Sequence, residues 1–215
     1  SSDLVFPADD VVRQFLEAQG RGEDYTPWLP DEGCSYDETE SIDLSKLEPL
    51  MACPNQPDNV HPVSELPTTP VQQVFIGSCT NGSYGDIAKA ALVLKGRHVN
   101  DNVSCVCGVA TRQTYKQLLR DGYIEMLLDA GVRFLEISCG PCCGIGQTPA
   151  TNGVAVRTSN RNFSGRSGNP TAKLYLASPE TAAATAVKGS FATAAEIMGD
   201  DVVLLDSIHE PAQYP

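Results

Sequence analysis

The chain has 215 residues, of which 41% are hydrophobic and 20% are charged, and its formal net charge is −12. These values are typical of a globular protein, and the negative charge disfavours both a nucleic-acid-binding surface and a polybasic membrane patch. The sequence has no apolar run near the ~20 residues that span a bilayer, and Ser1–Pro7 lacks the layout of a signal peptide. We therefore expect a globular protein without a membrane anchor and without a nucleic-acid partner.

The first part of the chain contains few predicted elements. Residues 10–20 are expected to form a short helix, because their apolar side chains fall on one face and Gly20 ends the pattern. Residues 21–70 contain eight prolines, and a loop of this length is unusual inside a compact domain. We interpret this stretch as a connector with a short strand near Ser41–Leu44.

From Val71 onward, predicted strands alternate with predicted helices. The expected strands cover residues 71–77, 103–110, 132–138, 154–158, 173–177 and 202–205, and the expected helices cover 84–95, 111–120, 122–130, 179–186 and 192–198. Ser178 is expected to cap the fourth helix, since a proline and an acidic residue follow it. This alternation predicts an α/β fold with a mostly parallel sheet that is covered on both faces.

Two glycine-rich turns carry cysteines directly after predicted strands. Cys79 follows the strand at 71–77, and Cys139 and Cys142 follow the strand at 132–138. Ligand sites in such sheets form at the carboxyl ends of strands, so the two turns are expected to meet at one edge. A cysteine that only fills the core would not require that placement.

The other cysteines are interpreted as small apolar side chains, because free cysteines are among the most buried residues. They are Cys34, Cys53, Cys105 and Cys107. The three histidines are scattered without the spacing of metal ligands. Eight cysteines without a secretory signal favour metal-bound or reduced thiols over disulfides, and thus a reducing compartment, the cytoplasm.

Three kinds of chemistry are compatible with the cysteine turns. The pair Cys139 and Cys142 matches a thioredoxin-type C-x-x-C motif, but the residues that follow are a poor helix start. Structural zinc needs four ligands, and Cys143 is awkward as the fourth because it is adjacent to Cys142. An iron–sulfur cubane with three thiolates leaves one iron open as a Lewis acid, whereas four thiolates suit electron transfer.

The loop at residues 160–170 contains Arg161 and Arg166. Taken alone, it is compatible with a solvated surface loop. Beside a three-cysteine site, the two guanidiniums would form a carboxylate clamp, since bidentate Arg–carboxylate pairs fix orientation as well as charge.

Together, three motifs resemble those of the aconitase superfamily of iron–sulfur hydro-lyases. They are Gly77–Asn81, Cys139–Cys142 and Ser159–Phe163 with Gly165 and Arg166, in this order along the chain. The resemblance implies a [4Fe-4S] cluster whose ligands are Cys79, Cys139 and Cys142. It also implies that Arg161 and Arg166 bind the substrate and that Asn160 lies beside the cluster. Cys143 departs from the family pattern, in which an aliphatic residue is usual.

The resemblance also implies an architecture. Residues 71–215 would form a three-layer α/β/α cluster-binding domain, residues 41–70 a connector, and residues 1–40 the tail of a preceding domain. Family members have an additional N-terminal region that surrounds the substrate, and a swivel domain or small subunit that carries a catalytic serine. We therefore expect this chain to be an incomplete part of the enzyme, with no catalytic residue assigned in it.

The implied reaction moves a hydroxyl group on a 2-hydroxy di- or tricarboxylate by dehydration and rehydration. The residues around Thr158–Arg161 favour the 3-isopropylmalate dehydratase branch, which serves leucine biosynthesis, with aconitate hydratase and homoaconitase as alternatives. Two hypotheses of another class remain open, a cluster-free RNA-binding protein and a thiol-redox protein. The net charge of −12 disfavours the first of them.

Overall fold

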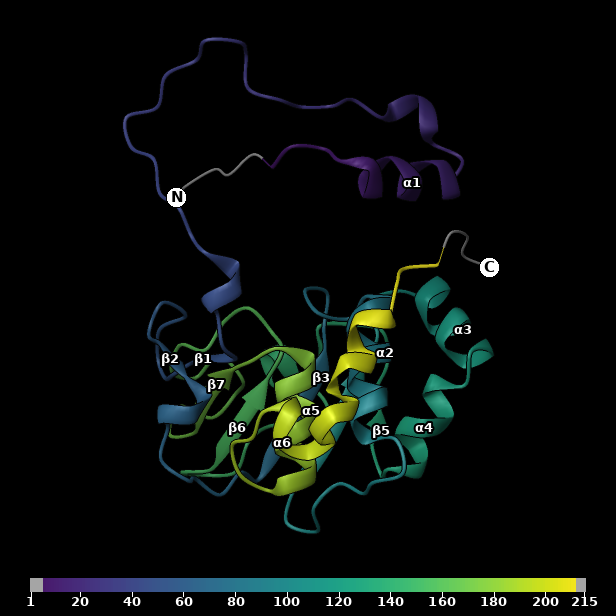
Figure 1. The fold of residues 1–215 in the computed structure, drawn as a ribbon. Helices are drawn as coiled ribbons and strands as arrows, with labels where there is room; N and C mark the ends of the chain where they lie inside the picture. The colour runs from purple at the N-terminus through teal and green to yellow at the C-terminus, as the bar shows by residue number, and fades with distance from the viewer. Residues whose placement is uncertain (1–5, 212–215) are drawn as a thin grey trace. The chain divides into compact units, whose positions relative to one another are not determined.

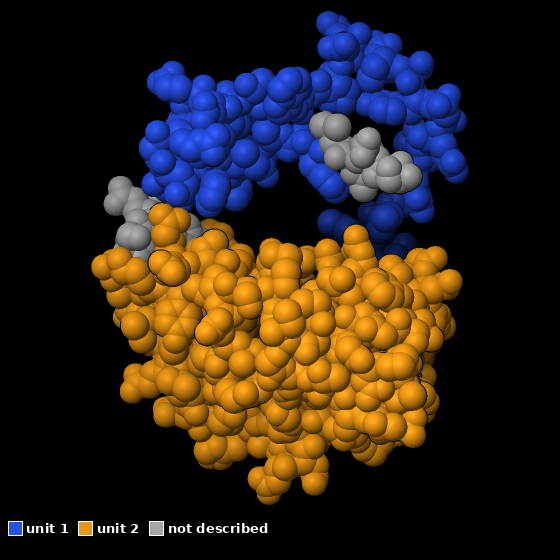
Figure 2. Space-filling model, turned by 180° about the vertical axis from the view of Figure 1, so that it is seen from behind, with its two compact units in different colours: residues 1–47, 211–215 blue, residues 48–210 orange. Residues whose placement is uncertain are grey.

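The computed structural model of the chain describes residues 6–211. The chain divides into two compact units, of which the first comprises residues 1–47 and 211–215 and the second comprises residues 48–210 (Figure 2). None of the helices in the described part of the chain combines the length and the apolar character that crossing a membrane requires.

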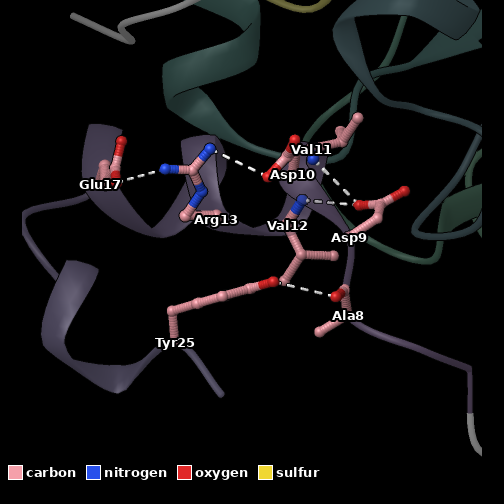
Figure 3. A network of polar contacts seen from close by, with 8 residues as sticks. All are labelled: Ala8, Asp9, Asp10, Val11, Val12, Arg13, Glu17 and Tyr25. Atoms are coloured by element: carbon pink, nitrogen blue, oxygen red, sulfur yellow. Dashed lines mark hydrogen bonds and ion pairs between the residues drawn. The ribbon is translucent and has the colours of Figure 1, made fainter. Parts of the chain in front are cut away.

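The first unit contains helix α1, Asp10–Ala18, which confirms the predicted helix. Asp9 caps it, since its carboxylate accepts hydrogen bonds at 3.0 Å from two backbone N–H groups of the first turn (Figure 3). The Tyr25 hydroxyl donates a hydrogen bond to the Ala8 carbonyl at 3.0 Å and so ties the following segment to the start of the helix. No residue of α1 is buried, so the described residues of this unit form no apolar core under the helix.

The strand predicted near Ser41–Leu44 is wrong. A 3₁₀ helix, η2, covers Leu44–Lys46 instead. The Asp43 carboxylate accepts hydrogen bonds from the Ser45 backbone N–H at 3.1 Å and from its hydroxyl at 2.6 Å. Such local side-chain bonds favour a turn over an extended strand.

A seven-stranded sheet with the order β2-β1-β7-β6-β3-β4-β5 forms the framework of the second unit. The strands are β1 Leu50–Ala52, β2 Val60–Pro62, β3 Gln73–Gly77, β4 Ser104–Gly108, β5 Arg133–Phe134, β6 Val154–Arg157 and β7 Lys173–Leu176. Strands β3 to β7 pair in parallel, whereas β1 pairs antiparallel with both β7 and β2. The predicted α/β class with a mostly parallel sheet is thus confirmed.

The helices of this unit are α2 Tyr84–Leu94, α3 Arg112–Arg120, α4 Tyr123–Asp129, α5 Pro179–Lys188 and α6 Ala194–Met198. Helices α2, α5 and α6 contact one another and lie together on one side of the sheet (Figure 1). Ser178 caps α5 as predicted, because its hydroxyl accepts the Thr181 backbone N–H at 3.2 Å. Every residue of β3 is buried, which explains why the sequence of this strand is mostly apolar.

A short 3₁₀ helix, η4, covers Gly140–Cys143 and packs against the sheet through Cys142. Cys142 shares a buried cluster with Phe75 of β3 and Val106 of β4, and Leu135 packs against that cluster. Helices and turns therefore cover the sheet, in agreement with the predicted three-layer α/β/α arrangement. The η4 turn positions Cys142 against it.

Four further elements differ from the sequence-based expectation. Strand β5 has two residues instead of the predicted 132–138, and the predicted strand at 202–205 lies within a 3₁₀ helix, η5, Gly199–Ser207. A short apolar run does not distinguish strand from helix by itself, and Val203 is exposed here. Strands β1 and β2 lie inside the predicted connector, and the compact unit begins at Glu48. The assignment of residues 1–40, 41–70 and 71–215 to a tail, a connector and a domain stays a prediction.

Candidate functional site

The segments that carry the predicted site residues leave the same edge of the sheet. Gly77 at the end of β3 pairs in register with Gly108 at the end of β4, and Arg157 at the end of β6 pairs with Phe75. Three segments follow the carboxyl ends of parallel strands. They are the turn with Cys79, the stretch that leads to Cys139, and the loop at residues 160–170, called the arginine loop below. Strand β4 lies between β3 and β5, so the two cysteine turns do not come from neighbouring strands.

The turn that carries Cys79 is fixed by a close backbone approach. Gly77 has φ +108°, and a Cβ atom there would lie 2.0 Å from the Gly108 carbonyl oxygen, so this position requires glycine. Ser78 follows with φ 89°, and its backbone N–H donates to the same carbonyl at 2.9 Å. The turn presents the Cys79 side chain at the surface, with its sulfur 3.9 Å from the Thr80 hydroxyl.

Thr158 joins this turn to the start of the arginine loop. Its hydroxyl accepts the Gly77 backbone N–H at 2.7 Å and donates to the Gly77 carbonyl at 2.8 Å. The Asn81 side-chain amide donates to the Thr158 carbonyl at 2.5 Å. The two bonds of the Thr158 hydroxyl are buried, so they are shielded from water and fix the end of β6 against the turn that carries Cys79.

The second cysteine turn is compact. Helix η4 ends at Cys143 and is followed by Gly144, which has φ +84°. Gly144 lies so close to the loop at residues 160–170 that a Cβ atom there would be 2.7 Å from the Ser167 carbonyl oxygen. Cys139 is exposed, Cys142 is buried, and the half-buried Cys143 donates its S–H to the Gly140 carbonyl at 3.4 Å. The Cys139 backbone thus precedes one short 3₁₀ turn, which differs from the α-helix start of a thioredoxin-type site.

Arg166 lies against this turn. Its Nη2 donates to the Cys142 sulfur at 3.4 Å. That hydrogen bond, followed by the charges of Cys142, Cys143 and Cys139, raises the pKa of Arg166 against the opposing effect of its partial burial. The structure therefore brings a predicted substrate-binding arginine to a predicted cluster ligand.

A second guanidinium, that of Arg157, approaches the same turn from inside the protein. Arg157 is completely buried, and it donates through Nη1 to the Pro141 carbonyl and through Nη2 to the Gln73 side-chain oxygen. Burial lowers the pKa of Arg157 to about 10, while nearby Cys142 acts to raise it, so the group is protonated at neutral pH. Arg157 was not among the predicted site residues. The feature that could have indicated it is an arginine at the end of an otherwise apolar predicted strand.

Buried polar atoms without partners are concentrated in this region. Among the described residues they are Nε of Arg157, Oγ of Ser159, Oδ1 of Asn162 and Nε of Arg166. An unpaired buried polar atom costs about 1–3 kcal/mol, so native structures contain few of them. Their concentration in one segment at the carboxyl edge of the sheet indicates a site shaped for a polar or charged group.

The remaining loop residues are placed differently. Asn160 and Arg161 are exposed, and Arg161 Nη1 donates to the Asn160 carbonyl at 2.9 Å. The Asn162 side chain anchors the loop, because its amide donates to the carbonyls of Cys53 at 2.8 Å and Gln56 at 3.3 Å between β1 and β2. The hairpin from the predicted connector therefore supports the arginine loop.

The other four cysteines differ in their exposure to solvent. Cys105 and Cys107 are buried in β4, as expected, and burial raises the pKa of Cys105 to about 12. Cys53 is partly buried, and this burial raises the pKa of its thiol. Cys34 is exposed, so the interpretation of that side chain as a buried apolar residue is wrong.

The described residues contain no group of three or more His, Cys, Asp or Glu side chains arranged to hold a metal ion. Cys79 is thus not gathered with Cys139 and Cys142 in this arrangement. The donor set nevertheless fits an iron–sulfur cluster in its chemistry, because soft thiols occupy turns at one sheet edge and two guanidiniums flank Cys142. The assignment of Cys79, Cys139 and Cys142 as ligands stays a prediction.

Comparison with known proteins agrees with these motifs. A profile of the aconitase family (aconitate hydratase) matches residues 64–189. The 3-isopropylmalate dehydratase large subunit 2 of Archaeoglobus fulgidus is 43% identical over 195 residues, which are 90% of this chain and 47% of that protein. The 3-isopropylmalate dehydratase large subunit of Pyrobaculum arsenaticum is 45% identical over 190 residues, 88% of this chain and 45% of that protein. The chain spans about half the length of the curated relatives it matches, and it belongs to the aconitase family.

Proposed function

We propose that this chain is the cluster-binding part of a 3-isopropylmalate dehydratase large subunit, acting in the cytoplasm. The proposed reaction moves a hydroxyl group on a 2-hydroxy dicarboxylate by loss and re-addition of water. The relatives that carry this name support the proposal. The observation that carries it is the 3.4 Å contact of Arg166 with Cys142, which joins a carboxylate-binding group to a candidate iron ligand.

In this proposal the thiolates of Cys79, Cys139 and Cys142 hold a [4Fe-4S] cluster. When bound, such a cluster supplies an open iron that acts as a Lewis acid toward a substrate hydroxyl. Cys143 is not needed as a ligand, since its S–H already donates to the Gly140 carbonyl at 3.4 Å.

The two loop arginines are proposed to hold the substrate carboxylates, with Asn160 beside them. Within the described residues, neither Arg161 nor Arg166 forms an ion pair with an aspartate or glutamate. Their guanidiniums are therefore available for bidentate contacts, which fix the orientation of a carboxylate. Arg161 is the more accessible of the two, and Arg166 lies closer to the cysteine turn.

The remaining parts of the enzyme are also proposals. The group that takes the carbon-bound proton would come from the other part of the large subunit, and a small subunit or swivel domain would complete the substrate pocket. Family membership and the share of the relatives that this chain covers support both partners.

Anaerobic reconstitution of the chain tests the cluster. We expect about four iron and about four sulfide per chain, the content of a cubane. Cys79→Ser, Cys139→Ser and Cys142→Ser should each lose iron, whereas Cys105→Ser is the matched control in the buried strand β4. Full iron content in the three variants, or loss of iron in Cys105→Ser alone, would contradict the ligand assignment.

Substrate class is tested on the reconstituted chain. We expect 3-isopropylmalate, but not citrate, to change the electron paramagnetic resonance spectrum of the reduced cluster. Arg161→Lys should weaken that response while iron content stays constant, because lysine lacks the planar fork of arginine. A response to citrate alone would favour aconitate hydratase, and reactive thiols without any iron uptake would favour the thiol-redox hypothesis.

A further inference from the structure

Strand β6 ends in a buried arginine on the side of the sheet that carries the cysteine turn. Arg157 pairs in register with Phe75, and in parallel strands paired residues share a face. Phe75 packs against Cys142, so the Arg157 side chain extends beneath the same turn. Its relative exposure is 0%, which separates it from the half-buried Arg166 on the solvent side.

The contacts of Arg157 fix the backbone of the turn. Its guanidinium donates to the carbonyl of Pro141, the residue directly before Cys142, and to the side chain of Gln73 in β3. Gln73 is itself buried, so the bridge between sheet and turn lies in a dry region. A hydrogen bond from a charged donor in such surroundings is strong and resists exchange with water.

The charge of Arg157 lacks a counter-charge in the described residues. None of the ion pairs includes Arg157, and its Nε has no hydrogen-bond partner. A buried charge is expensive unless an opposite charge or several hydrogen bonds compensate it. The guanidinium reaches the carbonyl of Pro141, which directly precedes Cys142, so the compensating negative charge is expected on the cysteine side.

We propose that Arg157 is a positioning residue for the Gly140–Cys143 turn and supplies the buried positive charge that balances an anionic cluster held by Cys142. This inference rests on the proposed function for its second half, whereas the positioning of the turn does not depend on a cluster. The Arg157 charge acts through buried protein, where Coulomb interactions are stronger and less screened by salt than in water. A nearby positive charge favours the more negative, reduced state of the cluster.

The reduction potential of the reconstituted chain tests the charge. Arg157→Met and Arg157→Gln remove it, Arg157→Lys retains it, and Arg133→Gln is the matched control. Arg133 is an exposed arginine of β5 that bonds to Gln147 at 3.0 Å, beyond the same turn. We expect the neutral variants to shift the reduced-to-oxidised ratio about tenfold toward the oxidised form, which corresponds to about 59 mV for one electron. Arg157→Lys and Arg133→Gln should stay near the wild-type potential.

Amide hydrogen exchange of the cluster-free chain tests the positioning. We expect the amides of residues 142–144 to exchange about tenfold faster in Arg157→Met and Arg157→Gln, with Arg133→Gln unchanged. Methionine keeps the site apolar and filled, so Arg157→Met provides a folded variant if glutamine does not.

Each outcome decides the inference. If both neutral variants fold and keep the wild-type reduction potential, the charge-balancing role of Arg157 is wrong. If the amides of the turn exchange at the wild-type rate in these variants, the positioning role is wrong. If the wild-type chain takes up no iron, the proposed function fails and the charge-balancing role fails with it. The exchange measurement then still decides whether Arg157 holds the turn.

Discussion

The two cysteine turns leave the same edge of the sheet but are held by different means. The Cys79 turn is fixed by backbone geometry, through Gly77, Ser78 and the buried hydroxyl of Thr158. The turn around Cys142 is held by side-chain charge, with Arg166 on one side and Arg157 on the other. One turn thus presents an exposed thiol on a rigid backbone, and the other presents a buried thiol between cations.

The ligands of one proposed site can thus be held in place by different interactions. A backbone-fixed turn has its position set by steric contacts, which are insensitive to salt and pH. A charge-flanked turn has its thiol environment set by electrostatics, which stabilise a thiolate or an anionic cluster.

Gly77→Ala should destabilise the protein most, by about 3 kcal/mol or more in the free energy of unfolding. The added Cβ would lie 2.0 Å from the Gly108 carbonyl oxygen at φ +108°, so backbone would have to move. Gly96→Ala is the matched control, since Gly96 has φ +69° with nothing within 4 Å of the added Cβ, and about 1 kcal/mol is expected there. Equal losses in urea denaturation would show that the close approach does not hold the turn.

Thr158→Val should lower the free energy of unfolding by about 2 kcal/mol. Valine keeps the shape but loses both hydroxyl bonds to Gly77, whose buried N–H is then left without a partner. Thr69→Val provides the comparison, because the exposed Thr69 hydroxyl donates only to the Pro67 carbonyl at 2.9 Å, and a change within about 0.5 kcal/mol is expected. If Thr158→Val has the wild-type free energy of unfolding, the two hydroxyl bonds to Gly77 do not stabilise the turn.

The thiol of Cys105 lies in the core, so it can be compared with the thiols of the two cysteine turns. Its pKa is raised by burial from 9.0 to about 12, so the unfolded chain loses this proton at lower pH than the folded chain. The associated stability is fully present below pH 9 and is lost as the pH rises toward 12, by about 1.4 kcal/mol per pH unit. Cys105→Val should reduce the alkaline slope of stability by that amount. Identical slopes in denaturation from pH 8 to 11 would contradict the burial argument.

Ser167→Ala should have the smallest effect, about 0.5 kcal/mol. The Ser167 hydroxyl donates to the Cys142 carbonyl at 3.4 Å, a long hydrogen bond that adds little to a turn held by charge. Ser164→Ala, which removes a 2.9 Å bond to the Pro170 carbonyl at the surface, serves as the control. A loss above about 2 kcal/mol in Ser167→Ala alone would mean that the arginine loop, and not the charges, holds the cysteine turn.

Much of the sheet was predictable from local pattern. The predicted strands at 71–77, 154–158 and 173–177 match β3, β6 and β7 to within two residues, because buried parallel strands are continuous apolar runs. The two strands of the hairpin, β1 and β2, were not predicted. Each has three residues, and the buried Met51 is surrounded by a proline-rich sequence, so tertiary contacts and not local pattern decide their conformation.

Candidate site residues could be predicted from the sequence only where the residue type itself indicates a reactive or binding group. Cysteines in glycine turns and paired arginines stand out in a sequence, and Arg166 does lie beside Cys142. Residues that act by holding others do not stand out. Asn162, whose amide bonds to Cys53 and Gln56, and Thr158, whose hydroxyl bonds to Gly77, depend on contacts between distant segments that no local pattern records.

The bond from Asn162 to the β1–β2 hairpin has a practical consequence for dissecting this protein. A fragment that starts at Val71 would begin at the predicted domain boundary, yet it would deprive Asn162 of the carbonyls of Cys53 and Gln56. It would also expose the edge of β7 that β1 covers at Ala52. We therefore expect a fragment that starts upstream of Leu50 to be more stable than one that starts at Val71, in which the uncovered edge of β7 favours aggregation.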